Sequence, residues 1–370
     1  MKNKSVAKSA LVPTVLKGVT LEQIKLIAES QRKRNITKIV NGKKNLIKKN
    51  LTKTGVNAPV ETAKPAIPRP AAKYLKNLAN DVTRVILPEK GAFNPGLVKM
   101  PNSENYVMVY RPDEKRFIGC LLDKNFKVIQ KTFHNFKTKN CADPRLIWLP
   151  DNRLLMIYSS TTQVGFNHEC IRGCFIMDLN KSSSSFVEGQ SFRVSPESLT
   201  SRQKNWMPFL HEDKIYLVAS ICPHEIYELK LNNGVECEKV YSTKWHNPWM
   251  FPDHFLRGNT NVIQLDDGNY LGTFHTAVWS GSKCYYDNGC YLFSGKPPFK
   301  VLKCANRTYL PAEGAVEKNV RHNKSIVCTF PVGMVREDDK IFISYGDNDS
   351  VVKIMKTSVD DMLSLMLDLY

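Results

Sequence analysis

One strand-forming unit recurs five times along the chain, and this repeat limits the fold more than any other feature. In each copy a polar turn precedes a short apolar run that ends in a polar or aromatic residue. The runs are Tyr106–Arg111, Leu154–Ser159, Ile215–Ser220, Tyr270–His275 and Ile341–Tyr345, and their turns lie between about 48 and 71 residues apart. All-strand repeats of about 40–50 residues or more are typical of β-propellers. The sequence therefore predicts an all-β fold, a five-bladed β-propeller over residues 81–370. A two-sheet sandwich is the alternative, because short strands at regular spacing suit it too.

Residues 1–80 differ from the rest of the chain in charge. They hold 18 of the 53 basic residues and only 3 of the 35 acidic ones, and so carry +15 of the formal charge of +18. Thr20–Gln23 has the pattern of a capping box that opens a helix. Asn57–Pro70 contains four prolines and reads as an extended linker. We expect a basic, partly helical arm that is either a solvated tail or a segment that binds an anionic partner or an assembly.

The C-terminal segment, the apolar runs and the cysteines give further predictions. Helical periodicity is confined to Ser358–Tyr370 and predicts a short C-terminal helix. No apolar run approaches the ~20 residues of a membrane helix, and no apolar segment follows the basic N-terminus, so we expect neither a membrane span nor a signal peptide. The ten cysteines are then expected to be free thiols in a cytoplasmic protein, or in a virion if the Lys- and Asn-rich composition reflects a viral source. His168, Cys170 and Cys174 have a spacing that a metal site could use, but cysteines of a hairpin strand are the favoured interpretation, and no metal is expected.

A second polar cluster precedes each repeated run and supplies the candidate site residues. The clusters begin at Phe93, Ala142, Lys204, Arg257 and Phe330. In a propeller they would form the loops that lead into the blades and would meet, with the polar ends of the repeated runs, at one mouth of the central channel. The combined set holds Arg111, Arg145, Lys204, Arg257 and His275 beside Asp143, Asp347 and Asp349. Many cations around few carboxylates suit an anionic group such as phosphate next to a polyol.

Seven of these segments, in their order and spacing, resemble glycoside hydrolase family 130. This family comprises five-bladed β-propellers, the mannoside phosphorylases, with related mannosyltransferase-like proteins of eukaryotes and viruses. The matching segments are Phe93–Pro95 with Tyr110–Arg111, Asp143–Arg145, Lys204–Trp206, Leu256–Thr260, His275, Phe330–Gly333 and Tyr345–Asp349. Ala142, Asn259 and Asn261 depart from the family pattern. The resemblance covers about residues 90–360 and leaves out the arm.

The resemblance implies an inverting glycoside phosphorylase or glycosyltransferase that acts on mannosides, with an oligosaccharide or sugar phosphate as its partner. Asp143 would be the catalytic acid, acting through a sugar hydroxyl, and Arg111, Lys204 and His275 match positions that hold phosphate. The expected sugar contacts are Asn94, Arg145, Asn205, Trp206, Arg257, Asp347 and Asp349. Inorganic phosphate would be a co-substrate and no cofactor is implied. One protein carboxylate suffices because phosphate is itself the nucleophile, whereas an inverting hydrolase needs a second one as base.

Several alternatives stay open at this stage. The chain could be a propeller without turnover that serves as a glycan-binding or structural module, docked through its arm. Asp143 and Arg145 could form an ion pair between blades, His275 could be a hydrogen-bonded core histidine, and the tryptophans could pack between blades. Asp347–Asp349 also fits the Asp-x-Asp motif of nucleotide-sugar transferases, but that fold alternates strands with helices.

Two further expectations concern Asp143. The following proline should restrict it to an extended backbone. A nearby Arg145 would lower the pKa of its carboxyl, and burial together with sugar contact would raise that pKa in the sugar complex.

Overall fold

The structure of the protein is a computed structural model. It describes residues 76–370 apart from gaps at 114, 137–140, 162–166, 178–184, 195–203, 232–234, 248–255, 313–314, 316 and 318–325. These residues belong to one compact unit, Pro65–Tyr370. The helix and linker predicted for the basic arm lie outside the described residues.

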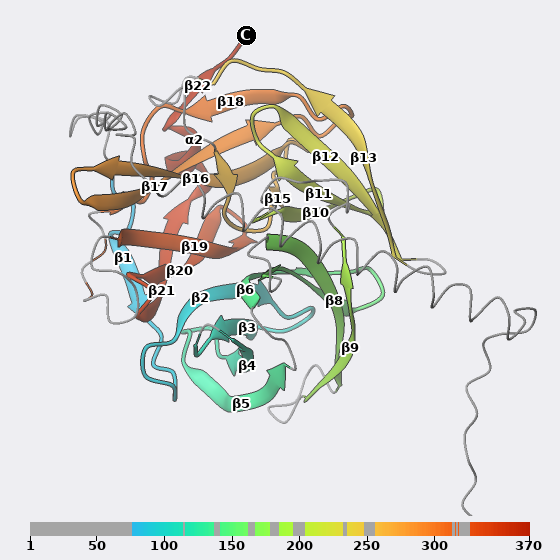
Figure 1. The fold of residues 1–370 in the computed structure, drawn as a ribbon, viewed down its shortest axis with the longest axis vertical. Coiled ribbons are helices and arrows are strands. Elements are labelled where there is room, and N and C mark those ends of the chain that lie inside the picture. Colours follow the sequence, from blue (N-terminus) through green and yellow to red (C-terminus); the bar gives the residue numbers. More distant parts are fainter. Residues whose placement is uncertain are drawn as a thin grey trace, which may run out of the picture. The chain divides into compact units, whose positions relative to one another are not determined.

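Five antiparallel blades form the described unit (Figure 1), which confirms the predicted all-β, five-bladed β-propeller. The first blade consists of β2 (Phe93–Lys99), β3 (Tyr106–Arg111), β4 (Phe117–Leu122) and β5 (Val128–Phe136). The second consists of β6 (Cys141–Trp148), β7 (Arg153–Thr161), β8 (Asn167–Met177) and β9 (Ser185–Arg193). The third consists of β10 (Met207–His211), β11 (Lys214–Ser220), β12 (His224–Lys230) and β13 (Glu236–Thr243).

The last two blades share one hydrogen-bonded sheet. In the fourth blade, β14 (Arg257–Gly258) and β15 (Ile263–Gln264) both pair with β16 (Tyr270–Ser280), which is followed by β17 (Lys283–Phe293) and β18 (Val301–Ala305). The fifth contains β19 (Ile326–Glu337), β20 (Lys340–Asp347) and β21 (Val351–Ser358). A short parallel pairing between β17 and β19 joins the two blades.

The ring is closed by a strand that precedes the first blade in sequence. β1 (Asp81–Arg84) pairs antiparallel with β21 and so becomes the outer strand of the fifth blade. Upstream of it, the amide of Lys76 donates to Oγ1 of Thr308 at 3.1 Å, and the amide of Leu78 donates to the carbonyl of Tyr309 at 2.8 Å. The two ends of the propeller are therefore held together by main-chain hydrogen bonds.

The repeated runs of the sequence are the second strand of each blade, one strand outward from the central channel. The innermost strands are β2, β6, β10, β14–β15 and β19, whose neighbours contact one another around the axis. The sequence pattern instead predicts loops at the starts of these strands. The reason is that proline, glycine and asparagine interrupt them, as in Phe93–Gly96, so that they lack a regular apolar alternation.

Hydrophobic side chains pack between neighbouring blades. Val109 of β3 and Leu146 of β6 share one cluster, and Leu155 of β7 and Leu217 of β11 share another. Each blade therefore covers the apolar face of the next one.

The C-terminal segment is only partly helical. Helix α2 (Val359–Leu363) is capped by Ser358, whose hydroxyl accepts from the amide of Asp361 at 3.0 Å. The predicted short helix is confirmed, but its extension to the C-terminus was wrong. The segment after it forms β22 (Met366–Asp368), because the edge of β18 offers it a strand to pair with. Within the described residues, no helix is long and apolar enough to cross a membrane.

Candidate active site

The same backbone irregularity occurs at the start of two innermost strands, β2 and β6, and just before a third, β10. Asn94, Asp143 and Asn205 have φ angles of 48°, 59° and 69°. Asparagine and aspartate tolerate this left-handed conformation better than other residues that carry a Cβ. In β2 and β6 a shift of strand register accompanies it, which marks a bulge that re-aims the side chain. The positive φ of Asp143 corrects the expected extended backbone: the bulge overrides the preference that proline imposes.

Close approach of neighbouring blades holds these bulges in place. A Cβ atom on Gly96 of β2 would clash with the carbonyl oxygen of Pro144 in β6. One on Gly346 of β20 would clash with the side chain and amide of Asn94. Glycine is therefore required at both positions for the adjacent blades to reach the candidate site residues.

The carboxylate of Asp143 lies at the centre of the candidate site and is 2% exposed. Its Oδ1 accepts a hydrogen bond from Nδ2 of Asn94 at 3.0 Å and lies 3.7 Å from a terminal guanidinium nitrogen of Arg111. Its Oδ2 lies 3.7 Å from Nζ of Lys204. Three blades thus contribute to one cluster, because Lys204 lies three residues before β10 while Asn94 and Arg111 belong to the first blade and Asp143 to the second.

Electrostatics keep the Asp143 carboxyl ionised among these neighbours. Burial by itself raises its pKa, but the charges of Lys204, Arg111 and Arg145 and the hydrogen bond from Asn94 together lower it below the ordinary value. In this arrangement Asp143 is a counterion for the cations around it, and it becomes an acid only when something offsets their charge.

Arg111 is held beside Asp143 by the ring of Phe93. Its guanidinium carbon lies 4.5 Å from the ring centroid, and only 11% of its side chain is exposed. Nε of Arg111 and Oδ1 of Asn94 are buried and have no hydrogen-bond partner among the described residues. The cluster therefore offers a ligand one hydrogen-bond donor, Nε of Arg111, and one acceptor, Oδ1 of Asn94, next to the Asp143 carboxylate.

His275 contributes from the fourth blade. It lies on β16, is 4% exposed, and its ring contacts those of Phe330 (centroids 5.0 Å apart) and Tyr286 (5.5 Å). Burial, followed by the charges of Lys204, Arg257 and Arg145, lowers the pKa of His275 well below its usual range, against an opposing effect of Asp143. The imidazole is therefore neutral and close to the cations of the Asp143 cluster.

Arg145 and Trp206, two of the expected sugar contacts, have fully buried side chains. Arg145 donates to the main-chain carbonyls of Asp143 (2.9 Å) and Asn259, and so ties the second blade to the fourth. It supports the bulge at Asp143 and has no exposed surface for a sugar. Trp206 is 0% exposed and packs on Tyr227, with ring centroids 4.7 Å apart, which fits the alternative of packing within the blades.

Three other expected sugar contacts, Arg257, Asp349 and Asn205, come from three different blades. Arg257 pairs in register with His275, and Asp349 is near enough to raise the pKa of Tyr286. Asn205 is buried, and its amide donates to Oγ of Ser159 at 3.4 Å.

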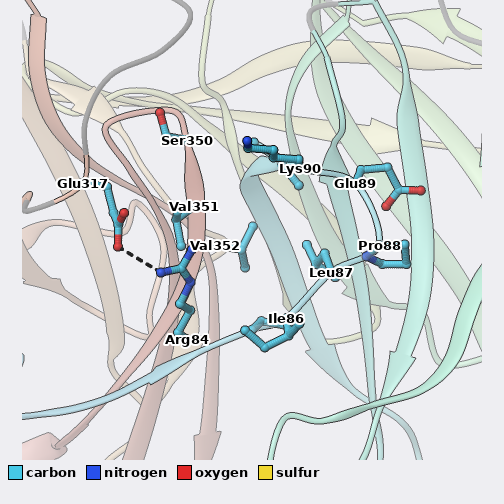
Figure 2. A pocket seen from close by; sticks show the side chains of 13 residues that line it. Arg84, Ile86, Leu87, Pro88, Glu89, Lys90, Glu317, Ser350, Val351 and Val352 are labelled. Carbon is cyan, nitrogen blue, oxygen red and sulfur yellow. Dashed lines mark hydrogen bonds and ion pairs between the residues drawn. The ribbon is translucent and has the colours of Figure 1, made fainter.

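Asp347 lies in a separate ion-pair network. It is fully buried, and its Oδ2 is 2.6 Å from Nζ of Lys353. Lys353 in turn lies 3.8 Å from Glu317, which pairs with Arg84 at 3.3 Å (Figure 2). Arg84 and Glu317 border a pocket of about 410 Å³ between the segment 84–92 and the start of β21. The ion pairs of Asp347 therefore lead, through Lys353, to the edge of this pocket.

Sequence reasoning missed several residues around His275. Tyr286 faces it from β17, and burial raises the pKa of the Tyr286 phenol to about 12. Asn259 bonds to His275 and to Asn288, which lies opposite His275 in the sheet. The polar and aromatic run Tyr285–Asn288, in the strand that follows His275, is the signal that could have identified them.

The possible metal ligands Cys170 and Cys174 lie on strand β8, where side chains are not described.

The fold and the cluster together define a five-bladed β-propeller in which the buried carboxylate of Asp143 lies among cations near the starts of the innermost strands. The family model for beta-1,4-mannooligosaccharide phosphorylase matches residues 62–368. The chain therefore belongs to glycoside hydrolase family 130, a family of carbohydrate-active enzymes, as the resemblance indicated.

Several solved structures share the fold at low sequence identity. A structure described as a putative glycoside hydrolase from Bacteroides ovatus is 15% identical with a TM-score of 0.52, over 74% of this chain and 88% of that one. The β-1,2-mannobiose phosphorylase from Listeria innocua is 13% identical with a TM-score of 0.50, over 79% and 94%. A structure described with family 130 hydrolases that target β-1,2 mannosidic linkages in Candida mannan is 13% identical with a TM-score of 0.53, over 76% and 92%. None of the curated proteins compared with the chain matches it.

Proposed function

We propose that the protein is an inverting phosphorylase of β-mannosides, which transfers a mannosyl group between an oligosaccharide and inorganic phosphate. The observation that carries the proposal is the buried carboxylate of Asp143 between Arg111 and Lys204, each 3.7 Å away. Family membership and the mannobiose phosphorylase among its structural neighbours support the substrate class. In the reverse direction the same site would use mannose 1-phosphate as the mannosyl donor.

The charges of the cluster favour phosphate as the nucleophile. A phosphate dianion would bind between Arg111 and Lys204, and the unpartnered Nε of Arg111 supplies a further donor. An inverting hydrolase would need a second carboxylate to activate water. Among the described residues, the ion pairs and hydrogen bonds of Asp143 bring no second carboxylate to the cluster.

Phosphate binding would also prepare the acid. The dianion would offset the positive charge of Arg111 and Lys204 and add negative charge near Asp143, and both effects raise the pKa of its carboxyl. The bound anion would thus convert Asp143 from a counterion to a proton donor.

The reaction then follows from these positions. Asp143 gives its proton to a sugar hydroxyl, which passes its own proton to the glycosidic oxygen. A phosphate oxygen bonds to the anomeric carbon as the bond from that carbon to the glycosidic oxygen breaks. The products are mannose 1-phosphate of inverted configuration and the shortened oligosaccharide. Asn94 holds the carboxylate in the direction of transfer through its 3.0 Å hydrogen bond.

The test is a phosphate assay in both directions. The full chain is incubated with phosphate and β-1,4- or β-1,2-mannobiose, and separately with mannose 1-phosphate and a panel of mannose acceptors. We expect phosphate to be consumed in the first case and released in the second. A parallel reaction with a nucleotide-linked mannose separates the phosphorylase from a nucleotide-sugar transferase. Binding of mannosides without turnover of any donor would instead support the glycan-binding module.

A further inference from the structure

A chain of buried amides leads to His275 from the fifth blade. Nδ2 of Asn288 donates to the main-chain carbonyls of Leu310 (2.8 Å) and Thr329 (2.9 Å). Its Oδ1 is therefore the atom that accepts from Nδ2 of Asn259 at 3.0 Å. Oδ1 of Asn259 then faces Nδ1 of His275 at 2.7 Å. Because main-chain carbonyls can only accept, they fix the direction of every hydrogen bond in the chain.

This direction determines which nitrogen of His275 carries hydrogen. Oδ1 of Asn259 can only accept, so Nδ1 of His275 must donate to it. The ring is neutral, because burial and the charges of Lys204, Arg257 and Arg145 outweigh the effect of Asp143. A neutral imidazole with hydrogen on Nδ1 has none on Nε2. Nε2 is therefore an acceptor, and no described residue donates to it.

We propose that Asn259 and Asn288 hold His275 as a hydrogen-bond acceptor in the anion site, and that this acceptor selects hydrogen phosphate over sulfate. The inference rests on the proposed function, since it takes Arg111, Lys204 and His275 to surround the phosphate. At neutral pH hydrogen phosphate has one hydroxyl, which can donate to Nε2, while its other oxygens accept from the two cations. Sulfate has the same shape and charge but no hydroxyl. Asn259 and Asn288 are positioning residues, because they act only through His275.

The size of the selectivity follows from the unpaired acceptor. Bound sulfate would leave Nε2 without a donor and would place an oxygen lone pair against it. Leaving a buried polar group unsatisfied in this way weakens binding by roughly tenfold to a hundredfold. We therefore expect the dissociation constant of sulfate to exceed that of phosphate by at least about tenfold, although both are dianions.

Two measurements on the full chain test the proposal without any turnover. Nitrogen-15 NMR of the imidazoles reports which nitrogen of His275 is protonated, with assignment from the spectrum of His275→Gln. Isothermal titration calorimetry gives the affinities for phosphate and for sulfate at constant ionic strength. We expect hydrogen on Nδ1 and the selectivity given above. Hydrogen on Nε2, or equal affinities, would overturn the inference. If neither anion binds, the proposed function fails together with it.

A matched pair of variants tests the role of Asn259. In Asn259→Asp the new carboxylate accepts from Nδ1 and stabilises the protonated imidazolium, so Nε2 gains a hydrogen and sulfate affinity rises until the ratio approaches one. The control is Asn261→Asp, since Asn261 is also buried but bonds to the main chain of Met334 (both contacts 2.9 Å). The control should keep the wild-type ratio. An unchanged ratio in folded Asn259→Asp would overturn the positioning role, and the wild-type measurements still decide the proposal if that variant does not fold.

Discussion

Replacement of Asp143 with asparagine removes one negative charge while it keeps the shape of the side chain. Asn94 can still donate to the new amide oxygen across the 3.0 Å contact. The change leaves Arg111 and Lys204 without their counterion, each 3.7 Å away. At an effective dielectric constant of about 20, each such pair of unit charges contributes roughly 4 kcal/mol of attraction. The variant therefore separates the electrostatic role of the carboxylate from its packing.

Three quantities should change in Asp143→Asn. The free energy of unfolding should fall by about 2–4 kcal/mol, less than the summed attraction, because the cost of burying the carboxylate disappears as well. Turnover should fall by about 10²–10⁴, the usual effect of losing a general acid. Phosphate affinity should rise, since the repulsion between the carboxylate and the anion is gone.

The assay combines turnover, calorimetric phosphate binding and denaturant unfolding of the same preparation. Asp347→Asn is the matched control, because Asp347 is also a buried carboxylate, paired with Lys353 at 2.6 Å outside the Asp143 cluster. The control should lose stability but keep turnover and phosphate affinity. Normal turnover in Asp143→Asn, or weaker phosphate binding than in the wild type, would refute the assignment of Asp143 as the acid beside the anion.

Three other predictions concern residues outside the chemistry. Trp206→Ala should lower the free energy of unfolding by about 3–5 kcal/mol and leave the KM for mannosides unchanged, since the ring is fully buried. A higher KM with intact stability would instead show that Trp206 contacts the sugar. Burial lowers the pKa of His224 to about 4, so between pH 6.5 and 4 the unfolded chain binds a proton that the folded one does not. Stability should therefore fall by about 1.4 kcal/mol per pH unit as the pH drops through this window, and unfolding curves of His224→Phe should show a smaller slope. Deletion of residues 1–64 should abolish retention on heparin at moderate salt with little change in melting temperature. Deletion of residues 1–84 should also lower the melting temperature, because β1 is lost. Equal heparin retention without residues 1–64 would place the anion-binding surface on the propeller.

The order of the polar segments decided which residues could meet. Asn94, Asp143 and Asn205 stand at equivalent places in successive blades, with Lys204 next to the last of them, and the propeller brings equivalent places to the same end of the ring. This is why residues from three blades reach one carboxylate. The sequence located the strands less well, because the strongest alternation belongs to the second strand of each blade and the bulged innermost strands do not show it.

The sequence by itself determined the number of blades and the chemical types available to the site, because both depend on local patterns of apolar, polar and charged residues. Only the tertiary structure decided what each side chain does there. Arg111 faces the Asp143 carboxylate while Arg145 binds main-chain carbonyls, although both belong to the same motif set. His275 owes its orientation to Asn259 and to an amide chain anchored in the next blade. These roles depend on bulge geometry, burial and hydrogen bonds between residues far apart in the chain, and the spacing of residue types does not encode them.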